Sequence, residues 1–154
     1  MMQTGDIQSV GKWISVLHRQ SQVYIGRQLK PYGLGASEYI YLVHLATEKG
    51  DINQKQLSDL IMIDNALTTR AMKSLEKKGY IIRGKKKSDQ RCYTVKLTEK
   101  GNEIIPVILH TLDNWSHSIL QGITGDETDY IIRNLMVMSQ NALCITKGDT
   151  HEQD

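Results

Sequence analysis

The sequence predicts a mostly α-helical fold with one small β-hairpin. Long segments place apolar residues three and four positions apart, which is the period of an amphipathic helix. Only two prolines occur in 154 residues, so little interrupts such helices. One short run, Tyr93–Leu97, instead alternates apolar and polar residues as a strand does. The length is that of a single domain with helical extensions, residues 1–154.

Two helices are expected in the first fifty residues. Segment 7–30 has helical apolar spacing and stops at Pro31, because proline disfavours the helical conformation of the residue before it. Ser37 is a suitable N-cap for a second helix, whose apolar residues run on toward Gly50. Both segments therefore contribute an apolar face to the core.

Two shorter helices follow in close succession. Asn53 is expected to cap the segment QKQLSDLI, and Asp64 to cap the helix that ends at Gly79. The inward stripe of this fourth helix comprises Thr68, Ala71, Met72 and Leu75. The two helices and the turn between them form a compact pair.

The rest of the chain is expected to form the hairpin and two further helices. Tyr80–Ile82 is the predicted partner of the strand at Tyr93–Leu97, and a long basic turn joins them. A fifth helix opens at Thr98 and continues to about residue 121, with a kink at Pro106. A sixth helix opens at Asp126 and runs to about residue 145.

Basic residues are concentrated in the middle of the chain. Residues 70–100 hold eleven Lys/Arg and three Asp/Glu, a balance of +8 that the overall +2 conceals. Residues 1–69 hold six of each sign, and residues 101–154 hold two basic and eight acidic residues. Such a concentration is typical of a surface that neutralises phosphates, although a solvated lysine-rich loop gives the same balance.

Two short helices, a turn and a β-hairpin make a winged helix-turn-helix, in which the later helix enters the DNA major groove. On that helix the expected DNA contacts are Asn65, Thr69, Arg70 and Lys73. Gln54 and Lys55, at the start of the preceding helix, are expected to hold a phosphate. Lys85, Lys86 and Lys87 lie in the hairpin and are expected to contact phosphates.

The sequence resembles the multiple-antibiotic-resistance regulator (MarR) family from about residue 7 to residue 143. The wing segment DQRCYTVKLTEKG matches that family's Asp-x-Arg tip, strand and Leu-Thr-x-x-Gly helix start, and DNALTTRAMKSLEKKGYIIR matches its recognition helix. The resemblance places Arg91 at the wing tip, where it enters the minor groove while Asp89 holds its guanidinium. The chain departs from the family at Leu67 and Thr68, where a small polar and a branched apolar residue are usual.

The resemblance also implies a homodimer. Residues 36–100 would form the DNA-binding lobe, and residues 7–30 with 101–146 the dimerisation region, followed by a disordered tail at 147–154. The implied activity is that of a ligand-responsive repressor on an inverted-repeat operator. Its effector would be a small phenolic or aromatic molecule between the dimerisation helices and the lobe, and the candidate lining residues are Arg19, Tyr39 and His44.

Metal and thiol sensing remain as alternatives. His110, Asp113 and His117 share one face of the fifth helix and are potential ligands, although no tight His-x-x-x-His pair or clustered cysteine supports them. Cys92 lies in the wing, whereas Cys144 is expected in the core. No resident cofactor is expected.

Other classes of function find little support in the sequence. We see no nucleophile elbow, phosphate-cradling glycine loop or zincin motif, so an enzyme is not expected. No apolar run approaches the roughly 20 residues of a bilayer span, and a cytoplasmic protein is expected. A winged-helix protein-interaction module without a DNA target remains open.

Overall fold

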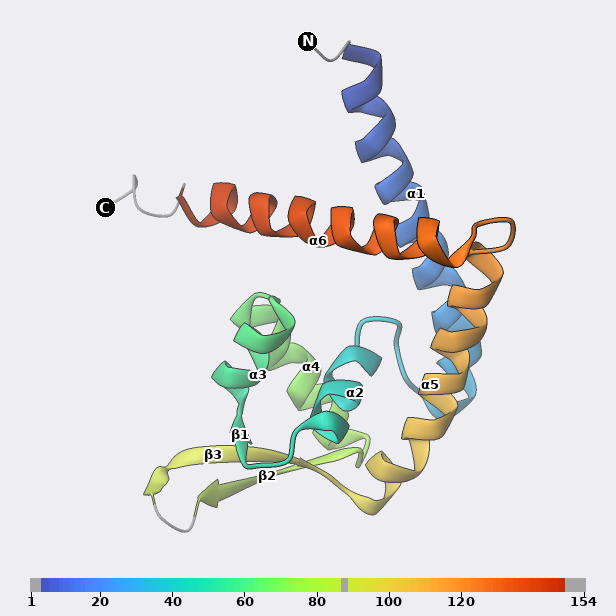
Figure 1. The fold of residues 1–154 in the computed structure, drawn as a ribbon. Helices are drawn as coiled ribbons and strands as arrows, with labels where there is room; N and C mark the ends of the chain where they lie inside the picture. The colour runs from blue at the N-terminus through green and yellow to red at the C-terminus, as the bar shows by residue number, and fades with distance from the viewer. Residues whose placement is uncertain (1–3, 87–88, 149–154) are drawn as a thin grey trace. The chain divides into compact units, whose positions relative to one another are not determined.

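The computed structural model describes the backbone of residues 4–86 and 89–148, and the side chains of residues 10–85 and 93–146. These residues form α1 (Thr4–Leu29), the 3₁₀ helix η1 (Lys30–Tyr32), α2 (Tyr39–Thr47), β1 (Ile52–Asn53), α3 (Gln54–Ile61), α4 (Asn65–Lys77), β2 (Ile81–Lys86), β3 (Asp89–Leu97), α5 (Glu99–Ile119) and α6 (Gly125–Gly148) (Figure 1). The predicted mostly helical fold with a β-hairpin is confirmed. The chain divides into two compact units between Trp115 and Ser116, and each is described by itself.

The sheet is antiparallel, with the strand order β1-β3-β2 (Figure 1). Sequence alone missed β1, whose Ile52 pairs with Val95. The hairpin strands also extend well beyond their predicted ends, into the segment expected to be a basic turn. Lys85 pairs with Tyr93 inside this ladder, so the strand continues through basic residues that show no apolar alternation.

The hydrophobic core lies within the first unit and draws on every layer of it. Its buried residues are Ile25, Leu29, Leu34, Tyr41, Leu42, Leu45, Ile52, Leu57, Met72, Leu75, Tyr80, Ile81, Val95, Ile104 and Ile108. The C-terminal half of α1 and the N-terminal half of α5 are thus packed with the lobe that carries α3 and α4. Tyr24 and Trp115 add an aromatic contact between α1 and α5, with ring centroids 5.4 Å apart.

The caps predicted for α3 and α4 are confirmed. Asn53 Oδ1 accepts the Gln56 N–H at 2.8 Å, and Gln56 Oε1 accepts the Asn53 N–H at 2.9 Å, which completes a capping box. Asp64 Oδ1 accepts the N–H groups of Ala66 at 2.6 Å and Leu67 at 3.2 Å. The two helices of the helix-turn-helix therefore begin where side-chain oxygens can satisfy their first N–H groups.

The start of α2 differs from the prediction. The helix begins at Tyr39, and its N-cap is Glu38 rather than Ser37. Glu38 is buried, and its carboxylate accepts the Gly35 N–H at 2.6 Å and bonds with Lys78 Nζ at 2.7 Å. This ion pair joins the start of α2 to the end of α4, and the Glu38 side chain makes no cap hydrogen bond to α2 itself.

Acid is expected to weaken the fold through Glu38. Burial alone would raise the pKa of this carboxyl, but hydrogen bonds from Lys78, Ser74 and the Gly35 N–H outweigh it and hold the pKa below the ordinary 4.5. The stabilisation is therefore complete above the ordinary pKa and is lost as pH falls through the folded-state pKa. Glu38→Gln should be less stable than the wild type at neutral pH and lose less stability between about pH 5 and about pH 3. Denaturant unfolding at several pH values measures this, and parallel curves would contradict it.

The start of α5 lies against the end of α4 and the start of β2. Thr98 Oγ1 donates to the Gly79 carbonyl at 2.6 Å and accepts the Gly101 N–H at 3.0 Å, while the Thr98 N–H donates to the Tyr80 carbonyl at 3.1 Å. A Cβ on Gly101 would overlap the carbonyl oxygen of Tyr80. Close approach of the backbone therefore requires glycine at this position of the Leu-Thr-x-x-Gly segment.

The last two helices were predicted within a few residues of their ends. The α5 helix continues unbroken past Pro106, and α6 extends through Gly148, two residues into the predicted tail; residues 149–154 lie outside the described part of the chain. Cys144 is exposed on α6, so its assignment to the core was wrong. None of the helices in the described ranges combines the length and apolar character that a bilayer span requires.

Candidate nucleic-acid interface

The rotation of α4 about its own axis is fixed by a buried stripe. Thr68, Met72 and Leu75 are fully buried, as predicted for Thr68 in place of a branched apolar residue. The Thr68 hydroxyl donates to the Asp64 carbonyl at 3.0 Å and lies 3.2 Å from Tyr41 Oη. The buried hydroxyl is therefore fully partnered, and α4 presents one defined side outward.

The side opposite this stripe carries positive charge. At about 100° per residue, Ala66, Arg70, Lys73 and Lys77 point away from the stripe, and all four are exposed; we call these residues the α4 outer face. Asn65 is exposed at the first position of the helix. A small residue in the first turn, followed by three cations, lets the helix approach a polyanion closely.

Thr69 and Gln54 are hydrogen-bonded to each other, a contact that the sequence did not predict. Gln54 Nε2 donates to Thr69 Oγ1 at 2.7 Å, and that hydroxyl donates in turn to the Asn65 carbonyl at 2.8 Å. The hydroxyl proton of Thr69 is therefore occupied, so the side chain offers a methyl group and one acceptor to a ligand. The amide of Gln54 retains a second N–H that a phosphate oxygen can accept.

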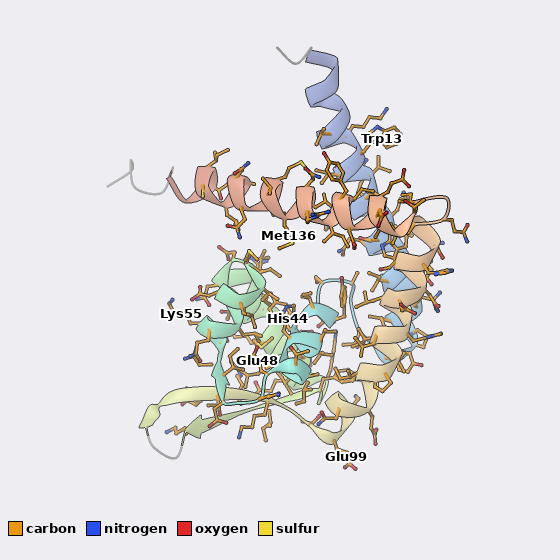
Figure 2. The ribbon with its side chains drawn as sticks, in the orientation of Figure 1. Trp13, His44, Glu48, Lys55, Glu99 and Met136 are labelled. Atoms are coloured by element: carbon orange, nitrogen blue, oxygen red, sulfur yellow. The ribbon has the colours of Figure 1, made fainter. Side chains whose placement is uncertain are left out.

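Lys55 extends outward from α3 (Figure 2). Its Nζ lies 3.1 Å from Asp59 Oδ2 one turn later, and both side chains are largely exposed. An exposed pair of this kind contributes little to stability, so the ammonium group remains available to an anion.

The wing presents Lys85 and Tyr93 side by side. They are cross-strand partners, and Lys85 Nζ lies 6.0 Å from the centroid of the exposed Tyr93 ring. The Arg83 side chain is less free to bind an anionic ligand, because its Nη2 and Nε donate hydrogen bonds to Glu76 Oε2 at 2.6 and 3.0 Å. These hydrogen bonds hold the pKa of Glu76 below its ordinary value and tie β2 to the end of α4.

The remaining predicted wing residues are described only in part. Lys86, Asp89 and Arg91 lie on strands rather than in a loop, with Lys86 opposite Asp89, and their side chains lie outside the described residues. Lys87 lies outside the described residues altogether. The tip roles of Asp89 and Arg91 therefore stay predictions.

Three residues of this surface were missing from the sequence prediction. The helical period places Ala66 and Lys77 on the outer side of α4 once Thr68 is known to be buried. From the later turns of α4, the sequence prediction includes only Thr69, Arg70 and Lys73 as DNA contacts. Tyr93 could have been found from its place in the alternating run, opposite a lysine. Aromatic strand residues are usually assigned to a core, and for that reason it was overlooked.

The residues predicted to bind an effector are separate in their contacts. Arg19 Nη1 bonds with Ser15 Oγ at 2.6 Å, and His44 Nδ1 lies 2.8 Å from the Ile40 carbonyl, so each side chain is engaged on its own helix. Tyr39 packs against the core, where burial raises the pKa of its phenol.

The metal alternative receives no support from the described residues. His110, Asp113 and His117 are all exposed, and His110 Nε2 lies 3.0 Å from Asn114 Nδ2. No group of three or more His, Cys, Asp or Glu side chains within the described ranges is placed to hold a metal ion. A shared helical face therefore did not suffice to build a site.

Fold and surface together define a winged helix-turn-helix protein of the DNA-binding class. The sequence profile of the MarR family matches residues 36–93. The HTH-type transcriptional regulator SarZ of Staphylococcus epidermidis is 34% identical over 109 residues, 70% of each chain. The HTH-type transcriptional regulator BilQ of Clostridioides difficile is 28% identical over 131 residues, 85% of this chain and 88% of that protein.

Solved structures give the same result. A MarR transcriptional regulator from Methanosarcina mazei Go1 is 36% identical with a TM-score of 0.78, over 90% of this chain and 99% of that one. A MarR family regulator from Listeria monocytogenes, solved in complex with a 26mer DNA, is 28% identical with a TM-score of 0.76, over 96% and 97%. The chain belongs to the MarR family, and it is a DNA-binding transcription regulator of a family that is not enzymatic.

Proposed function

We propose that this regulator is a homodimeric repressor that binds an inverted-repeat operator and is released by a small aromatic effector. The observation that carries the proposal is the α4 outer face, whose cations are held in one orientation by the buried Thr68 stripe. In this proposal Arg70 and Asn65 contact bases, since their side chains offer paired hydrogen bonds to guanine and adenine. Lys73, Gln54, Lys55 and the wing lysines contact phosphates, while the Thr69 hydroxyl accepts the hydrogen bond that holds the Gln54 amide.

Exposed apolar residues on the terminal helices support a dimer. In the first unit α1 exposes Val10, Trp13, Ile14 and Leu17; in the second, α6 exposes Tyr130, Ile132, Leu135, Met136, Val137 and Ile145. Figure 2 labels Trp13 on α1 and Met136 on α6. Large apolar side chains exposed in such numbers on each helix are typical of a protein interface, and we propose a second copy of the chain as the partner that covers them. Residues 7–30 and 101–146 then form the dimerisation region, and residues 36–100 the DNA-binding lobe.

Two-fold symmetry sets the geometry of the proposed operator. Two recognition helices would meet successive major grooves, so the half-sites should be inverted and about one helical turn apart. Repression would follow by excluding polymerase from the promoter. An effector bound near Arg19, Tyr39 and His44 would release DNA only through its different affinity for the two separations of the lobes.

Selection from a random duplex pool with the full chain tests this function. We expect one inverted repeat to be enriched, two chains per duplex by ultracentrifugation, and affinity that falls steeply as salt rises. A duplex with one half-site scrambled is the matched control and should lose most of the affinity. Phenolic acids are then screened for release of the selected duplex.

The alternatives give different results in the same experiment. A protein-interaction module would enrich no sequence and would bind duplex DNA weakly even at low salt. A chain that remains monomeric on the duplex, or an enriched site without internal symmetry, would contradict the dimeric part of the proposal. No release by any phenolic acid would contradict the effector part alone.

A further inference from the structure

Leu67 occupies an unusual place for a large apolar side chain. It is the third residue of α4, in the turn that leads into the groove in a helix-turn-helix, and 52% of it is exposed. Its N–H is held by Asp64 Oδ1, and the next residue, Thr68, is fully buried. Because its own N–H is held by Asp64 and the next residue is buried, the backbone at Leu67 is fixed, and with it the direction of the Leu67 Cα–Cβ bond.

The Leu67 side chain takes no part in the hydrophobic core of the part of the chain that the structure describes. It is also absent from the described residues that pack against this core. Helical geometry places it at one flank of the α4 outer face, beside Ala66 and one turn before Arg70. Single exposed leucines are common on proteins, so its position carries the argument and its exposure alone does not.

We propose that Leu67 reads the 5-methyl group of a thymine in each operator half-site, an inference that rests on the proposed DNA-binding role of α4. Thymine presents the only methyl group on the major-groove edges of the four bases. The leucine side chain has no hydrogen-bond donor or acceptor. Against adenine, guanine or cytosine it would displace water from a polar base edge and would offer that edge no hydrogen bond in return. Leu67 therefore selects thymine by apolar contact, while neighbouring polar residues select by hydrogen bonding.

Removal of single methyl groups from the DNA tests this assignment. In the duplex selected by the wild-type chain, each thymine of a half-site is replaced in turn by deoxyuridine, which lacks only the 5-methyl group. At one position of the half-site, and at the symmetry-related position, the wild-type chain should bind the deoxyuridine duplex about fourfold more weakly than the thymine duplex. This is the change in affinity expected when one buried contact the size of a methylene group is lost. Leu67→Ala should bind the thymine and deoxyuridine duplexes equally at that position.

A matched variant separates this contact from a general loss of apolar surface. Leu60 is also exposed, at 43%, but lies on α3 rather than α4. Leu60→Ala should retain the fourfold difference between thymine and deoxyuridine. Unchanged thermal unfolding of Leu67→Ala would show that the helix is intact, since alanine is favourable at an exposed helical position.

The assignment and the proposed function fail in different ways. If no thymine of the half-site is sensitive to its methyl group, or if the sensitivity persists in Leu67→Ala, Leu67 does not read thymine although the chain still binds its operator. If the wild-type chain enriches no duplex, the proposed function itself is wrong and the Leu67 assignment falls with it.

Discussion

Gly101→Ala is expected to lower the free energy of unfolding by about 3 kcal/mol. The added Cβ would overlap the Tyr80 carbonyl oxygen and lie 3.1 Å from Leu97 Cδ2. Neither neighbour can yield easily: the Tyr80 carbonyl accepts the Thr98 N–H, and Leu97 is paired in the ladder with Ile81. The backbone of α5 must therefore shift away from β2, and denaturant unfolding measures the cost.

Gly50→Ala is the matched control for this substitution. Nothing lies within 4 Å of a Cβ built on Gly50, so alanine is expected to leave the stability nearly unchanged there. A Gly101→Ala protein that is as stable as Gly50→Ala would show that α5 is free to move relative to β2. Close approach of the backbone would then not be the reason for glycine at this position of the Leu-Thr-x-x-Gly segment.

Arg70→Ala is expected to weaken operator binding by about 1–3 kcal/mol, most of it at one base pair of each half-site. Arg70 is exposed near the middle of the α4 outer face, opposite the buried Thr68 stripe, so its guanidinium faces outward. In the proposed complex the substitution removes a paired hydrogen bond to guanine, and discrimination at that position should relax. Binding to the selected duplex and to its single-base variants measures both effects.

Two further substitutions show whether Arg70 reads a base. Lys73 lies three residues after Arg70 on the same face of α4. Lys73→Ala should weaken binding to operator and random duplexes alike, because a phosphate contact carries no sequence information. Arg27→Ala removes an arginine from the last turn of α1 and should leave operator binding unchanged. Equal losses on operator and random DNA for Arg70→Ala would reassign Arg70 to the phosphate backbone.

Local chemistry made the helix-turn-helix predictable from the sequence. Asn53 and Asp64 begin α3 and α4 because side-chain oxygens satisfy the first N–H groups, and this requirement is visible in the sequence. Gly79 ends the recognition helix with a positive φ of 79°, as its glycine suggested. The inward stripe of α4 followed from periodicity.

Features that depend on distant partners could not be predicted in this way. The N-cap of α2 is Glu38 rather than Ser37, and the carboxylate of Glu38 is bound by Lys78, forty residues away. The two-residue strand β1 exists only by pairing with β3, and a segment that short has no periodicity of its own. The hydrogen bond from Gln54 to Thr69 likewise joins two helices, and each residue seemed independent when read alone.

Lys78, at the C-terminal end of α4, is bound through both its side chain and its backbone carbonyl, and this limits how the recognition helix can move. Its ammonium group is bound by Glu38 of α2, while its carbonyl accepts a hydrogen bond of 2.7 Å from Lys100 Nζ of α5. Apolar residues recur at every turn of the α4 stripe. The stripe alone therefore opposes rotation of α4 about its axis more strongly than translation along that axis by one turn. These two contacts of Lys78 oppose such sliding, so the position of α4 along its own axis is fixed at its C-terminal end.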